Sequence, residues 1–540
     1  MAHAVGTRIG GHLVVESLEA LGAEVVFGLP GIHALAIWEG LRRSDVRYVG
    51  LRTELNAGFA ADGYARVSGK PGVILLSTGP GALNSLTALM EAASAHVPVV
   101  AVASQIPREL IGQGRGYLHE LPDQLASFTP VVKWAAQATS ADALPALLAE
   151  AWRRALTPPS GPVFLEIPVD VLTGETDVSP VQDLDGAPER PPLPPAELLA
   201  EAADLLSTAE RPVLWAGGGV LRSGAWEEVR ELAERLGAPV ATTYMGKGSF
   251  PEDHELSVGS ACDEGAFQDL VGGADVLLCV GTELGAETTA QYGLELEGRV
   301  IQIDAARERV GATYPALGLV GDARPILAAL LERVGERKDD GAARAAAVRS
   351  RIEQGLAGQG RELERTLLAT IRQAVPRDAV SSWDMTMLAY WAAFQFPAYS
   401  PRRYLYPLGS GTLGYAWPAS LGASLGAPGM PALAVAGDGG ILYGTQELAA
   451  ARQYGLPATL LVVDDGGYGI LRDYQRSAYG ETFSVDLEQP DFTALARAYG
   501  VPVESTTPEE LGEALGRAFE HEGPAVVHLP VSLEMWTPTL

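Results

Sequence analysis

Two apolar segments near the C-terminus each end in a loop that combines acidic residues with glycine. ALAVA (432–436) is followed by GDGG, and ATLLVV (458–463) is followed by DDGG. Both segments have the length and composition of buried strands, and the stretch between them has a helical pattern. In a parallel βαβ unit the two strand ends lie at the same edge of the sheet. The sequence therefore predicts that Asp438 and Asp465 lie close together, which suits Mg²⁺ bound through carboxylate and phosphate oxygens.

Short apolar runs alternate with helical patterns in three blocks of the chain, and residues 54–68 form one of the clearest helical patterns. Parallel sheets covered on both faces produce this alternation. The expected fold is α/β, with three doubly wound, mostly parallel-sheet domains. The expected strands are 24–28, 71–77 and 97–104 in the first block, 211–219, 238–244, 275–281 and 300–304 in the second, and 379–384, 431–439, 458–465 and 525–531 in the third.

Two polar breaks separate the three blocks. Residues 175–197 are rich in proline and charge, as in an extended linker, and residues 334–348 are polar and lead into a helix. We therefore expect domains at 1–175, 196–335 and 362–540. The first and third blocks could be distant copies of one architecture, although their sequences show no convincing identity.

Composition narrows the classes of protein and partner. A chain of 540 residues fits roughly three domains of ordinary size. The net charge of −28 argues against nucleic acid or an anionic membrane as a partner. Only two cysteines are present, Cys262 and Cys279, so a disulfide framework is excluded and a reducing cytoplasm fits. The N-terminus has no apolar signal region and no long apolar span is visible, so we expect a cytoplasmic protein without a membrane partner.

The GDG segment, with the acidic loop 27 positions after it, resembles the diphosphate-binding motif of thiamine diphosphate enzymes, which usually ends in Asn-Asn. Further segments match this family in the family's order over essentially the whole chain. They are FGLPG (27–31), RTELNAGFAADGYAR (52–66), TGPGALN (78–84), PVFLEIPVDV (162–171) and GSGTLGYAW (409–417). The resemblance implies a pyrimidine-binding domain, a middle domain and a diphosphate-binding domain, in that order.

The resemblance also implies roles for individual residues. Glu54 matches the catalytic glutamate that hydrogen-bonds N1′ of the cofactor and promotes loss of the thiazolium C2 proton. A lone glutamate there would otherwise be a charge favoured by the helix N-terminus. The Gly411 carbonyl matches the acceptor for the 4′-amino group, and Leu413 matches the residue that keeps the cofactor bent. Other expected cofactor-binding residues are Pro30, Thr78, Asn84 and Tyr468.

The metal loop carries the remaining cofactor contacts and one departure from the family. Asp438, the Asp465 side chain and the Gly467 carbonyl match the metal ligands. Gly439 and Gly440 match the backbone donors to the diphosphate. Asp464-Asp465 stands where the family usually has Asn-Asn, which adds a negative charge beside the diphosphate. We expect cofactor binding to survive this change.

The layout is similar to the acetolactate synthase branch, including the middle segment MGKGSFPEDHELSVG (245–259). Where that branch usually has Phe-Gln-Glu, this chain has Leu118-His119-Glu120. His119 is thus a second catalytic candidate, for the substrate carboxylate or a proton; the alternative is a loop histidine bonded to backbone. Ile470 and Tyr474 replace the Met and Trp that shape the substrate pocket. Together with His119, this also resembles decarboxylases of larger 2-oxo acids, such as guanidino-oxopentanoate.

The expected activity is decarboxylation of a 2-oxo acid followed by carboligation to a second carbonyl, as in acetolactate synthases. The alternative is release of an aldehyde. A non-catalytic, cofactor-binding homologue and a flavin-dependent oxidase are hypotheses of other classes. FAD is not favoured, because Gly217-Gly218-Gly219 lacks the third glycine of a dinucleotide motif. The resemblance implies a homodimer as the minimum active unit, and a homotetramer is a further option.

Two other patterns carry less weight. GASLG (422–426) fits the GxSxG nucleophile elbow, but that motif needs a preceding strand and its surroundings here are helical. The histidines are scattered without zinc-ligand spacing, so we expect no zinc site.

Overall fold

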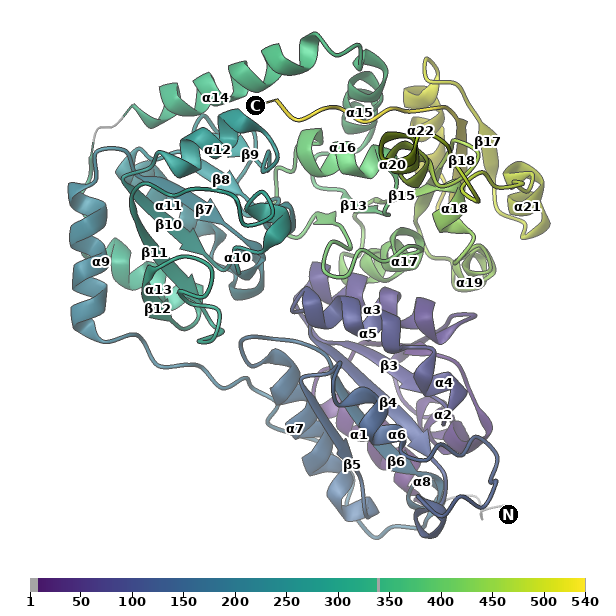
Figure 1. The fold of residues 1–540 in the computed structure, drawn as a ribbon. Coiled ribbons are helices and arrows are strands. Elements are labelled where there is room, and N and C mark those ends of the chain that lie inside the picture. Colours follow the sequence, from purple (N-terminus) through teal and green to yellow (C-terminus); the bar gives the residue numbers. More distant parts are fainter. Residues whose placement is uncertain (1–7, 338–339, 540) are drawn as a thin grey trace. The chain divides into compact units, whose positions relative to one another are not determined.

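The computed structural model describes residues 8–337 and 340–539. It contains three six-stranded sheets in which every strand pair is parallel, with helices on both faces of each sheet (Figure 1). This confirms the expected α/β class with three parallel-sheet domains. The expected domain start at residue 1 and end at residue 540 lie outside the described residues.

The first sheet has the order β2-β1-β3-β4-β6-β5. Its strands are β1 (Val25–Gly28), β2 (Arg47–Gly50), β3 (Gly72–Leu76), β4 (Val99–Gln105), β5 (Trp134–Gln137) and β6 (Val163–Pro168). Its helices are α1 (Gly10–Ala20), η1 (Ile32–Ala34), α2 (Leu35–Leu41), α3 (Glu54–Ser68), α4 (Pro80–Leu83), α5 (Leu86–Ser94), η2 (Arg108–Leu110), α6 (Gln124–Phe128), η3 (Ala141–Ala143), α7 (Leu144–Leu156) and α8 (Val169–Thr173). The predicted helix 54–68 matches α3. The sequence analysis missed β2, β5 and β6. Strands β2 and β5 lie at the edges of the sheet and are partly exposed, so they lack a continuous apolar run, whereas β6 is buried along its whole length.

The middle sheet has the order β12-β11-β10-β7-β8-β9, the arrangement of a dinucleotide-binding fold. Its strands are β7 (Val213–Ala216), β8 (Val240–Thr242), β9 (Ser257–Gly259), β10 (Val276–Val280), β11 (Arg299–Asp304) and β12 (Ala316–Val320). Its helices are α9 (Ala196–Thr208), α10 (Gly218–Ser223), α11 (Trp226–Leu236), η4 (Tyr244–Gly246), α12 (Gly265–Gly272), η5 (Ala286–Thr288) and α13 (Ala323–Leu331), and α14 (Gly341–Ala357) follows.

The third sheet has the order β14-β13-β15-β16-β18-β17, which repeats the order of the first sheet. Its strands are β13 (Val380–Trp383), β14 (Tyr404–Leu405), β15 (Ala432–Gly437), β16 (Thr459–Asp464), β17 (Val503–Ser505) and β18 (Ala525–Pro530). The helices of this part are α15 (Glu362–Ala374), α16 (Met387–Gln395), α17 (Ala416–Gly426), α18 (Asp438–Ile441), α19 (Glu447–Tyr454), α20 (Gly469–Tyr479), α21 (Phe492–Ala498) and α22 (Leu511–Phe519). The shared order supports the view that the first and third blocks are copies of one architecture.

The chain divides into two compact units. The first contains the N-terminal part up to Glu189 together with Gly409–Gly429 and Gly444–Ala458, so α17 and α19 belong to it. Within this unit α17 packs tightly on α3, since a Cβ on Gly422 would collide with the backbone of Ala60. Ser424 lies inside α17 and donates to Leu421 O at 2.8 Å, so the GxSxG pattern is a helix-packing feature.

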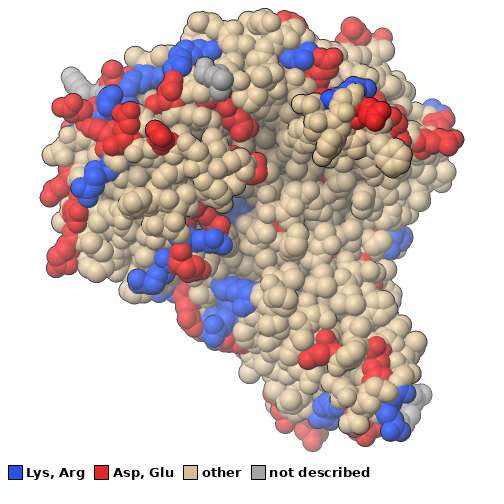
Figure 2. Space-filling view, viewed as in Figure 1, with Lys and Arg blue, Asp and Glu red and all other residues tan. Residues whose placement is uncertain are grey.

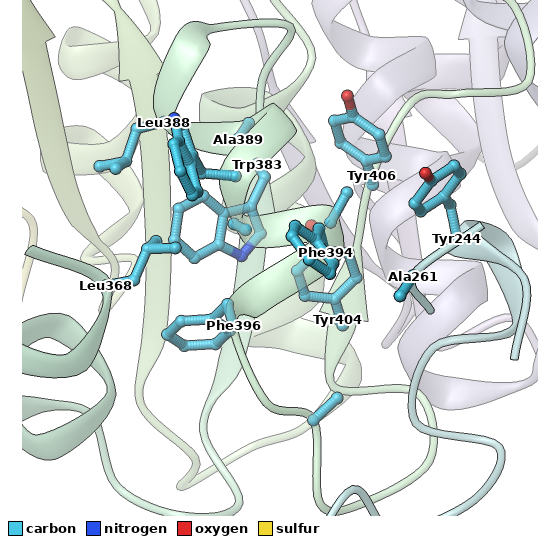
Figure 3. Close-up of a cluster of buried hydrophobic side chains, with 14 of the residues drawn as sticks. Tyr244, Ala261, Leu368, Trp383, Leu388, Ala389, Phe394, Phe396, Tyr404 and Tyr406 are labelled. Atoms are coloured by element: carbon cyan, nitrogen blue, oxygen red, sulfur yellow. The ribbon is translucent and has the colours of Figure 1, made fainter. Parts of the chain in front are cut away.

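The second unit holds the middle and third sheets, with segments 190–408, 430–443 and 459–540. One apolar cluster in it combines residues of both sheets, and Figure 3 shows the part around Trp383, which is fully buried. Cys262 and Cys279 are buried free thiols in this unit. No helix or strand lies between α8 and α9, in agreement with the proline-rich linker expected there.

Charged side chains of both signs alternate over the face shown in Figure 2. Among the described residues, none of the helices has the length and apolar character that crossing a membrane requires.

Candidate active site

Glu54 occupies the first position of α3, at the end of the loop that follows β2. Thr53 caps this helix by accepting a hydrogen bond from Asn56 N at 3.2 Å. The cap holds the backbone of the first helical turn, which carries the Glu54 side chain. Glu54 is 9% exposed, and Asn84 Nδ2 donates to its Oε2 at 3.2 Å. A Cβ on Gly81 would lie 3.0 Å from Glu54 Oε1, so a glycine at this position leaves the carboxylate accessible.

The TGPGALN loop follows β3 at the same edge of the first sheet. Thr78 is fully buried and its hydroxyl shares a hydrogen bond of 2.9 Å with Ser104, so only its backbone faces the loop. Gly79 N donates to Gln124 Oε1 at 2.7 Å, and Gln124 Nε2 donates to Glu166 at 2.9 Å. The sequence analysis did not single out this buried pair, which holds the loop in place. Pro30 is exposed on the neighbouring loop after β1.

The segment with Gly411 and Leu413 is tied to the interior of the first unit. Ser410 donates to Glu91 from both its backbone nitrogen (2.7 Å) and its hydroxyl (2.8 Å). Tyr415, at the other end, donates to Asp62 Oδ1 at 2.7 Å. Gly411 has φ = 68°, a conformation that favours glycine, and Leu413 is half-buried. These bonds fix the backbone on which both predicted cofactor residues lie.

Asp438 and Asp465 meet at the edge of the third sheet, as the sequence predicted. Strands β15 and β16 are direct neighbours, with Gly437 opposite Val463, so the next residues on each strand lie together. Burial and the adjacent charge of Asp465 raise the pKa of Asp438 to about 7. Burial likewise raises the pKa of Asp465, whose carboxylate is in hydrogen-bond contact with Asp438. Such a pair of close carboxylates is a pocket for positive charge.

The additional carboxylate of Asp464 is directed elsewhere. Its Oδ1 accepts from Gly466 N at 3.2 Å, and its Oδ2 lies 2.9 Å from His528 Nε2 on the neighbouring strand β18. Asp464 therefore shapes the turn of the loop instead of adding a third carboxylate to the acidic pair. His528 was not singled out from the sequence, since only the strand pairing brings it to this position.

Glycines allow neighbouring side chains to approach the backbone closely around the acidic pair. A Cβ on Gly439 would lie 2.7 Å from the Tyr468 ring, and one on Gly469 would lie 2.0 Å from Asp465 Oδ2. Gln489 Nε2 donates to Asp438 Oδ2 and is a further neighbour that the sequence analysis missed. A cavity of about 610 Å³ adjoins the loop, with Asp465, Gly469 and Met387 among its lining residues.

These residues fit a divalent cation that is bound jointly with a diphosphate. Across residues 8–337 and 340–539 no group of three or more His, Cys, Asp or Glu side chains is arranged to hold a metal alone. The acidic pair and the Gly467 carbonyl offer oxygen ligands only, the type that Mg²⁺ prefers, and further oxygens must come from a ligand. Gly440 N and Gly439 N lie at the start of α18, next to the pair.

The candidate substrate residues lie on two elements. Leu118 is 59% exposed and His119 has φ = 66°, in the loop before α6 of the first unit. Ile470 and Tyr474 lie one turn apart on the same face of α20 in the second unit. Ile470 is packed in the apolar cluster, whereas Tyr474 is 58% exposed.

Three family models match this chain in succession. They describe a thiamine pyrophosphate enzyme N-terminal TPP-binding domain (residues 8–127), central domain (199–330) and C-terminal TPP-binding domain (384–529). A protein of Pseudomonas aeruginosa named "probable 2-ketoarginine decarboxylase" is 39% identical over 532 residues, which cover 97% of this chain and 94% of that protein. The chain belongs to the thiamine pyrophosphate enzyme family.

Other relatives of this thiamine pyrophosphate enzyme are acetolactate synthases. A probable large subunit of Methanocaldococcus jannaschii is 33% identical, with 97% of this chain and 92% of that protein covered. The large subunit of Corynebacterium glutamicum is 34% identical, with 96% and 86% covered. The expected family, with its acetolactate synthase-like and 2-oxo acid decarboxylase branch, is confirmed, and the protein is an enzyme that uses thiamine pyrophosphate (thiamine diphosphate).

The predicted site residues of this thiamine pyrophosphate enzyme therefore form two groups. The first unit brings together the Glu54 carboxylate and the loops of the first sheet. The second unit brings together the acidic pair and the glycines around it. The supporting residues that sequence reasoning missed are polar side chains that no local motif marks: Gln124, Glu166, Gln489 and His528.

Proposed function

We propose that this enzyme decarboxylates a 2-oxo acid, with thiamine diphosphate held by Mg²⁺. The observation that supports this most directly is the carboxylate of Glu54, which is largely buried and accepts a hydrogen bond from Asn84. Thiamine diphosphate, when bound, supplies the carbon nucleophile that adds to the oxo group and holds the electron pair released with CO₂. The protein sets the geometry and the proton positions.

Each group of site residues has its own task in this proposal. Glu54 holds a proton at N1′ of the aminopyrimidine, and the Gly411 carbonyl accepts from the 4′-amino group. Leu413 would pack against the bound cofactor. Asp438, Asp465 and the Gly467 carbonyl hold Mg²⁺, while Gly439 N and Gly440 N donate to the diphosphate. These roles are supported by the hydrogen bond of Ser410 to Glu91 and by the close contacts at the site glycines.

The assembly follows from the same proposal. The family resemblance implies that Glu54 of one copy works with the acidic pair of another, so we propose a homodimer as the minimum unit and a homotetramer as a further assembly. We also propose domain limits at 1–175, 196–335 and 362–540, inside which the three family matches lie. A cytoplasmic location and a middle domain without FAD complete the proposal. An absorbance spectrum tests the last point, because bound flavin is yellow.

Carboligation to a second carbonyl is the first candidate for the step after CO₂ loss. The acetolactate synthases among the relatives support it. Release of an aldehyde is the second candidate, favoured by His119 and Tyr474 in place of the residues usual in that branch.

One cluster of the second unit favours a cationic 2-oxo acid for the second candidate. Tyr244 donates to Asp263 Oδ2 at 2.7 Å, and Figure 3 shows Tyr244 beside Tyr406 at the margin of the apolar cluster. Burial, followed by the charges of Glu287 and Asp263, raises the pKa of the exposed Tyr474, so these groups lie within electrostatic range. Tyrosine rings next to carboxylates bind ammonium or guanidinium groups. The 2-ketoarginine decarboxylase relative is named for a substrate of that class.

The decarboxylation itself is tested by measuring CO₂ release from a panel of 2-oxo acids, with thiamine diphosphate and Mg²⁺ added. Glu54→Gln should lower turnover by about 10² to 10⁴ while cofactor binding persists. Glu24→Gln, at an exposed glutamate paired with Lys70, is the matched control and should not change turnover. Absence of CO₂ from every acid, or unchanged turnover in Glu54→Gln, would contradict the proposal.

Two further comparisons test which step follows CO₂ loss and whether the substrate is cationic. With pyruvate as the substrate, acetolactate as the product indicates carboligation, and acetaldehyde indicates aldehyde release. Glu287→Gln should raise KM for 5-guanidino-2-oxopentanoate but not for its uncharged 5-ureido analogue, because only the first carries a cation. Glu297→Gln, also exposed, serves as the control. Equal effects of Glu287→Gln on both acids would remove the argument for a cationic substrate.

A further inference from the structure

Two histidine rings face each other at the active-site edge of the first sheet. His33 lies in η1, directly after the FGLPG loop, and is only 6% exposed. Its ring centroid is 5.4 Å from that of His119, with the ring planes at 69°. The Tyr117 ring also lies near His33, with the ring centroids 5.6 Å apart. Residues from two loops far apart in the sequence thus build one imidazole pair.

Both rings present a polar atom that is buried and has no partner. His33 Nδ1 and His119 Nδ1 make no hydrogen bond to any residue that the structure describes. A buried polar atom without a partner costs free energy, and native proteins usually satisfy it by a ligand or water. His119 also holds a left-handed backbone at φ = 66°, which is uncommon outside glycine and is concentrated at functional sites.

The position of Ser77 connects the pair with Glu54. Its hydroxyl, like the two imidazoles, is buried and makes no hydrogen bond within the described part of the chain. A Cβ on Gly31, two residues before His33, would lie 2.1 Å from Ser77 Oγ. A Cβ on Gly81 would lie 3.2 Å from Ser77 Cβ and 3.0 Å from Glu54 Oε1. Unpaired polar atoms therefore border the same loops that present the catalytic carboxylate.

The loop that carries His119 is held against this edge. A Cβ on Gly79 would lie 2.5 Å from His119 O, so the two backbones approach closely. Glu120 accepts from the backbone nitrogens of Tyr117 (2.9 Å) and Arg115 (3.2 Å), which closes the loop. His119 is thus positioned by backbone contacts on both sides, and its ring is free to serve a ligand.

We propose that His33, together with His119, binds the carboxylate of the 2-oxo acid substrate. The inference rests on the proposed function and adds His33 as a substrate-binding residue. Each Nδ1, as an N–H donor, can give one hydrogen bond to a carboxylate oxygen, which has several acceptor positions. Burial, and then the proximity of His119, lower the pKa of His33, which favours its neutral form. The pair thus offers two N–H donors to a single anion.

The test separates this inference from the proposed function by two measurements on the holoenzyme. His33→Phe keeps an aromatic ring and removes the donor, so KM for the 2-oxo acid should rise about 10-fold or more, with a smaller change in kcat. Exchange of the cofactor C2 proton for deuterium, followed by NMR after acid quench, needs Glu54 but no substrate and should be unchanged. The binding of oxamate, an unreactive carboxylate analogue, should weaken by the same factor as KM rises.

Two further variants keep the experiment decisive. His12→Phe is the matched control, since His12 is also buried (5% exposed), also has an unpaired ring nitrogen, and lies on α1; its KM should equal that of the wild type. His33→Gln retains an N–H donor and should recover part of the lost affinity, which also covers the case in which His33→Phe does not fold. Unchanged KM and oxamate affinity in both His33 variants would overturn the inference. Loss of C2 exchange in the wild type would instead overturn the proposed function.

Discussion

The side-chain amide of Asn56 donates a hydrogen bond of 2.9 Å to the carboxylate of Glu447 inside the first unit. Arg52 N donates to both oxygens of the same carboxylate, at 2.9 and 3.0 Å. Glu447 thus holds the backbone directly before Thr53 and Glu54, although it is almost 400 positions away in the sequence. This carboxylate is fully buried and, within the described part of the chain, accepts no hydrogen bond from a cationic side chain.

Protonation of Glu447 should make the stability of the protein depend on pH. Burial raises the pKa of Glu447 to about 7, above the value of about 4.3 of an unfolded chain. The folded state therefore binds this proton more tightly, so the stability it contributes is present below pH 4 and is lost as pH rises through about 7. The difference amounts to on the order of 3 kcal/mol. Thermal unfolding of Glu447→Gln between pH 5 and 8 should show a smaller decline than the wild type.

Glu509→Gln provides the comparison for this measurement, because Glu509 is exposed. Its unfolding temperature should follow the wild-type curve at every pH. Parallel curves for the wild type and Glu447→Gln would refute the assigned role of Glu447.

Much of the fold could be predicted from the sequence because buried parallel strands are continuous apolar runs. Strands such as β4 and β15, buried along their whole length, stood out for this reason. Strands β2 and β5 escaped notice because edge positions expose part of their residues, whereas β6 is fully buried but has Glu166 within its apolar run. The division into compact units was also not predictable, since α17 and α19 join the first unit through packing between distant segments.

In the candidate site, too, some residues could be predicted from the sequence and others could not. Asp438 and Asp465 could be paired from the sequence because two neighbouring strands end at both residues. The residues that hydrogen-bond to the loop could not be predicted. Gln489 and His528 belong to no motif, and only the fold brings them to the loop. The same holds for His33, whose neighbour His119 comes from a loop more than 80 positions later.

The buried ion network beneath the Gly411 segment should be essential for stability. Arg66 pairs with Asp62 at 2.6 Å and with Glu91 at 2.8 Å, and all three side chains are nearly inaccessible. Arg66→Met would leave two buried carboxylates without their cation, which costs about 3–5 kcal/mol. Because Ser410 and Tyr415 bond to the same carboxylates, cofactor affinity should fall as well.

Arg42→Met tests whether this effect is specific to the buried network. Arg42 pairs with Glu39 at the surface, where its side chain is 66% exposed, so its loss should leave stability nearly unchanged. Differential scanning fluorimetry and titration with thiamine diphosphate measure both quantities. Similar melting of Arg66→Met and the wild type would show that the network is dispensable.

Replacing Asp464 should reveal that it shapes the loop and does not bind the metal. Asp464→Asn keeps an acceptor for Gly466 N, and His528 can change tautomer to match the new amide, so Mg²⁺ affinity should stay within about twofold. Asp464→Ala removes the acceptor for both partners and should weaken Mg²⁺-dependent cofactor binding by about 10-fold. Isothermal titration calorimetry distinguishes these cases. Loss of most of the binding in Asp464→Ala, as expected for Asp465→Ala, would indicate that Asp464 coordinates the ion directly.

Asp465 should lose more binding on truncation than Asp464, because its carboxylate belongs to the acidic pair. Asp465→Asn retains an oxygen ligand and should keep cofactor binding, whereas Asp465→Ala should lose most of it. Equilibrium dialysis with thiamine diphosphate at several Mg²⁺ concentrations measures both. Full binding by Asp465→Ala would exclude Asp465 from the metal site.

Adding a single methyl group at Gly469 should disturb the acidic pair without removing any ligand. A Cβ there would lie 2.0 Å from Asp465 Oδ2 and 2.8 Å from Met387 Sδ, so the carboxylate must turn away. Gly469→Ala should therefore weaken Mg²⁺-dependent cofactor binding by about 10-fold or more, since a displaced ligand loses its contact with the ion. Gly516→Ala is the matched control in helix α22, where a Cβ meets nothing within 4 Å, and it should stabilise the protein by up to about 1 kcal/mol. If Gly469→Ala binds the cofactor as tightly as Gly516→Ala, the orientation of Asp465 is not required for the metal site.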